Sequence, residues 1–290
     1  QHSYSKSKKV TSQEDHVSQV STTVTAGGSI VLNAGKDLNL IASRVSAGDE
    51  AYLFAANNLT LQSAEDSDYS FYSKTKKSSS GKKSRLDEVA SNTNIASAVT
   101  SGGNSTLLAG NDMLIKGSEI AADKGGVQLV AGNDVQIVAV TDSNSARHES
   151  SSSKSSWGGL KSSKVKDQVS ETQTTAVGSV ISGNTVSVAA NRDATITGSS
   201  LVSTQDLTVQ TGRDLTINAA ENTFTRDEFH KEKNRDLSGV LTANNLGVDD
   251  ITGNQHLSVS KQNHTGKSAQ TTLTGSTIGS SEGNVSLTSG

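Results

Sequence analysis

Apolar and polar residues alternate strictly in six short segments that share one motif. Each copy reads apolar, any residue, Ala or Thr, a small or polar residue, a polar residue, Asp or Asn, apolar, any residue, apolar. The copies are Leu32–Leu40, Leu53–Leu61, Leu107–Ile115, Leu129–Ile137, Val188–Ile196 and Val209–Ile217. Alternation with a period of two residues is typical of a β-strand with one buried face. The motif therefore predicts two short strands joined by a tight corner, where Gly or Asn is expected to adopt positive φ and Asp to bond its own backbone.

The motif returns at regular intervals, which indicates a stack of one structural unit. We call the Asp or Asn of each copy the anchor residue; the anchors are Asp37, Asn58, Asp112, Asp134, Asp193 and Asp214. Anchors within a pair lie 21 or 22 residues apart, and first members of successive pairs lie 75 and 81 residues apart. A single coil of this length buries too little apolar surface to offset its backbone entropy, about 1–2 kcal/mol per residue. Stacked coils solve this, so we predict an all-β, right-handed parallel β-helix rather than an antiparallel sandwich.

Polar, Ser- and Lys-rich stretches separate the coil pairs. We predict coil pairs over about residues 24–65, 99–141 and 179–220, with a partial pair over 269–290. The excursions between them are expected over about residues 1–23, 66–98, 142–178 and 221–268. Each excursion is expected to leave the wall as a hairpin-like segment and to return through one less regular coil. Mild alternation in Asp87–Val99 and Asp167–Val177 is assigned to these returning coils.

The excursions resemble one another in their lysine clusters, which lie in Ser5–Lys9, Ser73–Lys77 and Ser152–Ser156. Two readings stay open: the lysines bind lipopolysaccharide phosphates or other acidic polymers, or they keep a solvated loop soluble. Trp157 stands beside two glycines and fits either an exposed hairpin tip or a contact that pins the excursion to the β-helix wall.

Composition narrows the class of protein. The chain has 290 residues, a net charge of −3, no cysteine and no proline. The absence of cysteine excludes disulfides and thiol catalysis and is compatible with export, and the absence of proline suits strands paired on both sides. The small net charge gives no general attraction to nucleic acid. No apolar run is long enough for a membrane-spanning helix, and the pattern begins and ends abruptly, so we expect a fragment of a larger protein.

Chemistry-bearing residues form no recognisable catalytic or cofactor site. The six histidines have no metal-ligand spacing; they are His2, His16, His148, His230, His256 and His264. Stacked anchor carboxylates resemble a calcium ladder, but Lys36, Arg192 and Arg213 precede anchors and neutralise them, so corner capping is the preferred interpretation. We predict no catalytic, cofactor-binding or metal-binding residue, and no cofactor. A carbohydrate-active β-helix stays a remote alternative, because aromatic residues that line sugar grooves are only 3% of the chain.

The recurring phrases resemble hemagglutinin repeats of filamentous-hemagglutinin-like exoproteins of two-partner secretion systems. They are Ala34-Gly-Lys-Asp-Leu-Asn-Leu, Ala109-Gly-Asn-Asp-Met-Leu-Ile-Lys-Gly-Ser, Ala131-Gly-Asn-Asp-Val-Gln-Ile and Thr211-Gly-Arg-Asp-Leu-Thr-Ile. The longer cycle of two coils and one excursion is similar to the second repeat region of contact-dependent growth inhibition proteins.

The resemblance implies a non-catalytic segment of a large exoprotein that an outer-membrane partner transports to the bacterial surface. It implies a role in delivering a toxin across a target cell's outer membrane, with the target envelope, a receptor or lipopolysaccharide as partners. An adhesin stalk that binds host or neighbouring cells is the alternative.

Overall fold

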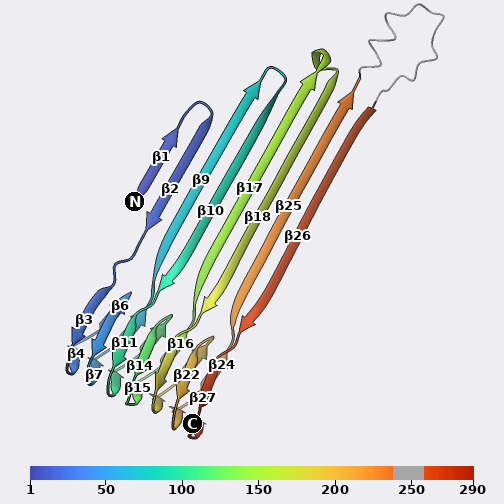
Figure 1. Ribbon diagram of the computed structural model, residues 1–290. Coiled ribbons are helices and arrows are strands. Elements are labelled where there is room, and N and C mark those ends of the chain that lie inside the picture. Colours follow the sequence, from blue (N-terminus) through green and yellow to red (C-terminus); the bar gives the residue numbers. More distant parts are fainter. Residues whose placement is uncertain (238–257) are drawn as a thin grey trace, which may run out of the picture.

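The chain forms coils of three short strands each, and equivalent strands of successive coils pair in parallel (Figure 1). The computed structural model describes residues 1–237 and 258–290. Within these residues, the first strands of the coils form sheet 1, whose strands are β3 (Thr22–Ala26), β6 (Ser43–Ala47), β11 (Ala98–Ser101), β14 (Glu119–Ala122), β19 (Val180–Gly183), β22 (Ser200–Ser203) and β27 (Thr277–Ser280). The predicted all-β fold with parallel pairing between coils is confirmed and is consistent with a β-helix.

The second and third strands of each coil form two further parallel sheets. Sheet 2 contains β4 (Ile30–Ala34), β7 (Ala51–Ala55), β12 (Ser105–Ala109), β15 (Val127–Ala131), β20 (Val186–Ala190), β23 (Leu207–Thr211) and β28 (Val285–Ser289). Sheet 3 contains β5 (Leu38–Ile41), β8 (Leu59–Gln62), β13 (Met113–Lys116), β16 (Val135–Val138), β21 (Ala194–Thr197) and β24 (Leu215–Asn218). We call the three sheets together the coil stack.

Inward-pointing side chains of the three sheets form one continuous core. In sheet 2, Leu107 lies between Leu53 and Leu129, and all three are fully buried. In sheet 3 the equivalent ladder of fully buried residues is Leu61, Ile115, Ile137 and Ile196. The same position at Ile217 is 43% exposed, because β24 is an edge strand of its sheet. The period-two alternation of the motif thus places its apolar residues on the buried face.

Four long hairpins leave the coil stack, and their strands pair with one another. The hairpins are β1 (His2–Lys6) with β2 (Val10–Val17), β9 (Ala64–Ser78) with β10 (Gly81–Ile95), β17 (Val140–Ser156) with β18 (Lys161–Val177), and β25 (Ala220–Asp236) with β26 (Ser258–Thr274). They form one antiparallel sheet in chain order, which we call the hairpin sheet (Figure 1). Residues 238–257 of the predicted excursion 221–268 lie outside the described residues.

The ratio of two coils to one hairpin follows from strand spacing. Neighbouring strands lie about 4.8 Å apart in either kind of sheet, so one hairpin and two coils both advance by about 9.6 Å. The hairpin sheet therefore grows in step with the coil stack, and every hairpin pairs with the next without strain.

Two predictions about the excursions are wrong. The segments Asp87–Val99 and Asp167–Val177 are not returning coils: most of the first, and all of the second, belong to the hairpin strands β10 and β18. A hairpin strand has the same period of two as a coil strand, so alternation does not distinguish them. The backbone of Trp157 lies in the 3₁₀ turn Trp157–Gly159 between β17 and β18, at the end of the hairpin away from the coils, which agrees with the reading of a hairpin tip (Figure 1).

The reason given for the corner glycines is also wrong. Among described non-glycine residues only Ala42 has positive φ, and the described glycines with positive φ are Gly117, Gly158, Gly159 and Gly198. Gly110, Gly132 and Gly212 at these corners instead allow close approach of successive coils, whereas a Cβ atom on Gly35 would meet nothing within 4 Å. A Cβ atom on Gly132 would lie 2.2 Å from the carbonyl oxygen of Gly110 in the preceding coil.

Candidate functional surfaces

The anchor residues form a hydrogen-bonded ladder along one corner of the coil stack. The side-chain oxygen of each anchor accepts a hydrogen bond from the backbone N–H of the anchor in the next coil: Asp112 accepts from Asp134 at 3.3 Å, and Asp134 accepts from Asp193 at 3.2 Å. The same contact joins Asp37 to Asn58, Asn58 to Asp112, and Asp193 to Asp214. The expected capping by anchors therefore exists, but it acts between coils rather than within one turn.

Arginine neighbours neutralise part of this ladder, as the sequence predicted. Arg213 forms an ion pair with Asp193 in the preceding coil, and Arg192 lies 3.6 Å from the Asp134 carboxylate. Lys36 makes no such ion pair among the described residues. The hydrogen bond from Arg213, followed by that from the backbone of Asp214, lowers the pKa of Asp193 to about 2 against burial.

Acid should loosen this corner below pH 4. Because the pKa of Asp193 is lower in the folded chain than its ordinary value of 3.8, its stabilising effect is complete above pH 4 and is lost as pH falls toward 2. The carboxyl ¹³C shift of Asp193 in an acid titration reports the midpoint. In an Arg213→Gln variant the midpoint should move to higher pH, and an unchanged midpoint would show that Arg213 does not set it.

Serines close the coils at the base of three hairpins. Ser97, Ser179 and Ser276 follow the hairpins, and each donates a hydrogen bond to the carbonyl of the last residue of the coil strand before its hairpin. Their acceptors are Gln62 at 2.8 Å, Val138 at 3.0 Å and Asn218 at 2.7 Å. These serines occupy the position that Ser43, Ser118 and Ser199 hold at corners without a hairpin. The hairpins are thus insertions into one corner of the coil, and the serine hydroxyl links the two ends of the coil across the base of the hairpin.

Replacement of Ser179 with alanine should destabilise the closed coil. Ser179 is fully buried. Its loss removes the partner of the Ser118 N–H and one of the two donors to the Val138 carbonyl, to which the Gly117 N–H still donates at 3.0 Å. Buried groups without hydrogen bonds cost about 1–3 kcal/mol each, so we expect a loss of about 2 kcal/mol in urea denaturation. The exposed Ser281→Ala variant is the control. Equal stability of the two variants would contradict this role.

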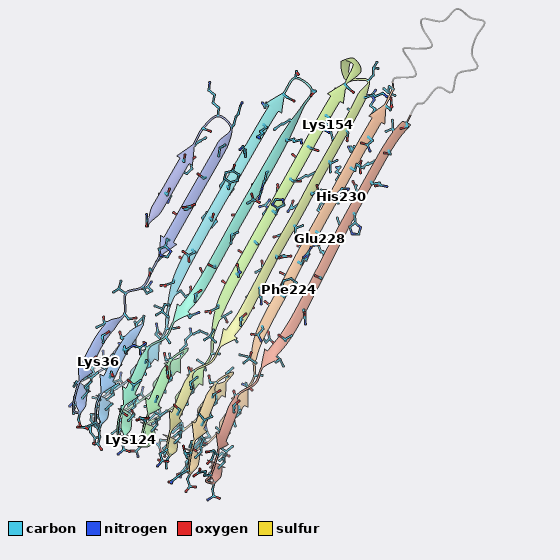
Figure 2. The ribbon with its side chains drawn as sticks, in the orientation of Figure 1. Lys36, Lys124, Lys154, Phe224, Glu228 and His230 are labelled. Carbon is cyan, nitrogen blue, oxygen red and sulfur yellow. The ribbon has the colours of Figure 1, made fainter. Side chains whose placement is uncertain are left out.

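Each of the three seams between neighbouring hairpins in the described chain carries a histidine–aspartate contact. The pairs are His16 with Asp68, His148 with Asp87 at 2.5 Å, and His230 with Asp167 at 2.5 Å. His230 lies on β25 in the outer half of the hairpin (Figure 2). Burial acts to raise the pKa of Asp87, but hydrogen bonds from Arg85 and His148 outweigh it, so this pKa is below its ordinary value. Sequence reasoning missed these pairs because the partners are 52 to 63 residues apart.

The structure brings the predicted lysine clusters together at the outer ends of the hairpins. Lys74, Lys76 and Lys77 lie near the end of β9, and Lys154 lies near the end of β17 (Figure 2). A hollow of about 800 Å³ between the tips is lined mainly by lysine and serine. On β9 the carboxylates Glu65, Asp66 and Asp68 lie at the opposite end of the strand, next to the coils. The outer end of the hairpin sheet is therefore a basic surface on a chain of small net charge.

No metal centre is evident in the residues that the structure describes. No three His, Asp or Glu side chains there are placed to hold one metal ion. The aromatic rings of Tyr52 and Phe54 on β7 stack on each other with centroids 6.3 Å apart. No described helix is both long enough and apolar enough to cross a bilayer.

The geometry defines a repeat protein in which two parallel coils and one inserted hairpin make a unit of about 80 residues. A model of the hemagglutinin repeat matches residues 2–86, 78–166 and 159–290, so the chain belongs to the hemagglutinin-repeat family. The resemblance read from the corner motifs is confirmed.

Curated relatives include proteins with nuclease names. The chain is 34% identical over 69% of its length to the 16S rRNA endonuclease CdiA of Enterobacter cloacae subsp. cloacae, and 32% identical over 93% to the tRNA nuclease CdiA of Escherichia coli strain STEC_O31. It is 28% identical over 66% of its length to a hemolysin of Serratia marcescens. The chain covers only 6%, 8% and 12% of these proteins, respectively. No solved structure matches it.

Proposed function

We propose that the chain is a non-catalytic, right-handed β-helical segment of a large secreted surface exoprotein of a two-partner secretion system. The main support is that relatives named for different activities share a region similar to this chain. Regions similar to this chain occur in relatives named 16S rRNA endonuclease, tRNA nuclease and deoxyribonuclease. A region common to proteins with different named activities does not determine which nucleic acid is cut. The right hand follows from the right-handed preference of crossovers between parallel strands.

The segment acts in toxin delivery across the outer membrane of a target cell. An outer-membrane transporter exports the parent protein to the bacterial surface, and the segment then engages the target envelope, with a receptor or lipopolysaccharide as its partner. The relatives' names and the rod of stacked coils with projecting hairpins support this assignment. The alternative is an adhesin stalk, which the basic outer end of the hairpin sheet favours, since attachment needs an exposed recognition surface.

Removal of one hairpin from the full-length exoprotein separates the two functions. Cells carrying the deletion of residues 139–177 are compared with cells in which residues 97–178, a whole repeat unit, are deleted. For toxin delivery, we expect the hairpin deletion to leave attachment to target cells intact and to abolish inhibition of their growth. Loss of attachment in proportion to loss of inhibition would favour the adhesin. Normal surface display, measured by antibody binding to intact cells, is the control for export.

A further inference from the structure

Five lysines stand in one row across the outer part of the hairpin sheet. Residues directly opposite on antiparallel strands point to the same face. Reading the register from β9 to β26 gives the sequence Lys77, Lys82, Ser153, Lys164, Lys233 and Lys261. All five lysine residues are exposed. We call these five the lysine row; it runs perpendicular to the strands and parallel to the direction in which the coils stack.

The rows on either side, on the same face, add positive charge and no negative charge. The row nearer the coils contains Lys166 opposite Lys231, with Ser84 opposite Ser151. The row nearer the tips contains Ser155 opposite Ser162 and Arg235 opposite Val259. No Asp or Glu occurs in these three rows among the described residues.

The opposite face of the hairpin sheet is mixed in charge. Lys76 lies opposite Lys83 on this face, and Glu232 of β25 stands in the same row. Asp167 of β18 stands in the next row toward the coils. The two faces therefore carry similar numbers of lysines but differ in the acidic residues beside them. Lysine substitutions on the mixed face can thus serve as a control for substitutions in the lysine row.

Like charges directly opposite on neighbouring strands destabilise a sheet. The lysine row contains three such contacts: Lys77 with Lys82, Lys164 with Lys233, and Lys233 with Lys261. None of the five lysines forms an ion pair with a described residue. Negative charge from a ligand would relieve this repulsion along the whole row.

We propose that the lysine row binds a linear acidic polysaccharide lying along the stacking direction. The lysines repeat at the strand spacing of about 4.8 Å, which is close to the spacing of charges on a polymer with one carboxylate per sugar. Serine hydroxyls between the lysines supply hydrogen bonds to sugar hydroxyls. This inference does not depend on the role in toxin delivery.

Charge placement favours a single polymer chain over a flat membrane or a nucleic acid. A flat anionic surface against this face would also meet Glu88 and Asp227, which share it nearer the coils. Single-stranded nucleic acid is normally held by aromatic side chains that stack on bases, and the three described rows contain none. A polymer that follows the lysine row meets five lysines and Ser153, and no acidic residue stands in the described rows on either side.

Binding of alginate oligosaccharides to the 290-residue chain, measured by isothermal titration calorimetry, tests the proposal. The row variant carries Lys82→Ser, Lys164→Ser and Lys233→Ser, and the control carries Lys76→Ser, Lys83→Ser and Lys154→Ser on the opposite face. Both lose three charges. We expect the row variant to bind more than tenfold more weakly, with a shallower dependence of affinity on salt, and the control to change less than threefold. Neutral dextran should not bind.

Three outcomes would overturn the proposal. Equal losses in both variants would show that net charge rather than the row is responsible. Retained alginate binding by the row variant together with lost binding to vesicles containing phosphatidylglycerol would assign the row to a membrane surface. If a variant fails to fold by circular dichroism, NMR of the unsubstituted chain decides. Alginate must then shift the side-chain signals of Lys164 and Lys233 more than those of Lys76 and Lys83, and the reverse order would reject the site.

Discussion

Deletion of residues 139–177 should leave the coil stack closed while dividing the hairpin sheet. The deletion removes Ala139, β17, β18 and the turn between these strands, and its junction reads Val138-Gly178-Ser179. This matches Lys116-Gly117-Ser118, a corner that closes without a hairpin through a glycine with φ of 54°. Glycine adopts this conformation at little cost, so the shortened corner has the residue it needs.

The hairpins on either side lose their partners. β10 and β25 pair with β17 and β18, and the coils hold them about three strand spacings apart, roughly 14 Å, once those strands are gone. They cannot meet without breaking the coil stack, so two long edges are left open to other chains. We expect faster hydrogen exchange in β10 and β25, concentration-dependent association in sedimentation, and unchanged protection of core amides such as that of Leu129.

A deletion of residues 97–178 is the matched control. It removes two coils and one hairpin together and joins Ala96 to Ser179, so the coil stack and the hairpin sheet each shorten by the same distance. This variant should stay monomeric although it lacks more of the chain. Native protection of β10 and β25 in the smaller deletion would show that the hairpins do not depend on one another.

The regular return of the corner motif made the coils predictable from the sequence. The contacts between hairpins follow no such repeat and could not be predicted. The motif gives each coil the same corner and the same inward residues, so a single sequence reveals the ladder from Leu53 to Leu129. Contacts such as His148 with Asp87 join strands from different insertions and depend on register. The second and third hairpins differ in strand length, with 15 residues in β9 and 17 in β17, so no fixed interval in the sequence marks these pairs.

The serines at the bases of the hairpins and the lysine row could likewise not be assigned a role from the sequence. Serine is abundant in this chain. Ser179 follows a glycine as Ser118 and Ser199 do, but the sequence alone does not show that its hydroxyl donates to a carbonyl 41 residues away. The lysine clusters were visible in the sequence, but their division between two faces requires the pairing of three hairpins, from β9 to β26. Composition therefore predicted basic excursions, whereas the distribution of basic and acidic residues between the two faces of the hairpin sheet depends on strand register.

Replacement of Gly132 with valine should be among the most damaging single changes in the coil stack. The backbone N–H of Gly132 donates to the carbonyl of Ala109 at 3.0 Å, which fixes the separation between the two coils at this corner. A Cβ atom there would lie 2.2 Å from the carbonyl oxygen of Gly110, far inside van der Waals contact. The corner must open, so the hydrogen bonds next to it weaken together with the core packing beneath. We expect a loss of about 3 kcal/mol or more in urea denaturation.

Gly35 supplies the control, because it holds the same motif position and a Cβ atom there would meet nothing within 4 Å beyond its own chain neighbours. Gly35→Val introduces the same side chain and the same loss of backbone freedom in the unfolded chain, so the difference between the variants isolates the close approach. Hydrogen exchange should show the change confined to the coils around β13, β15 and β16, since each coil contacts mainly its neighbours. Equal stability of the two variants would mean that the corner glycines serve a purpose other than coil-to-coil contact.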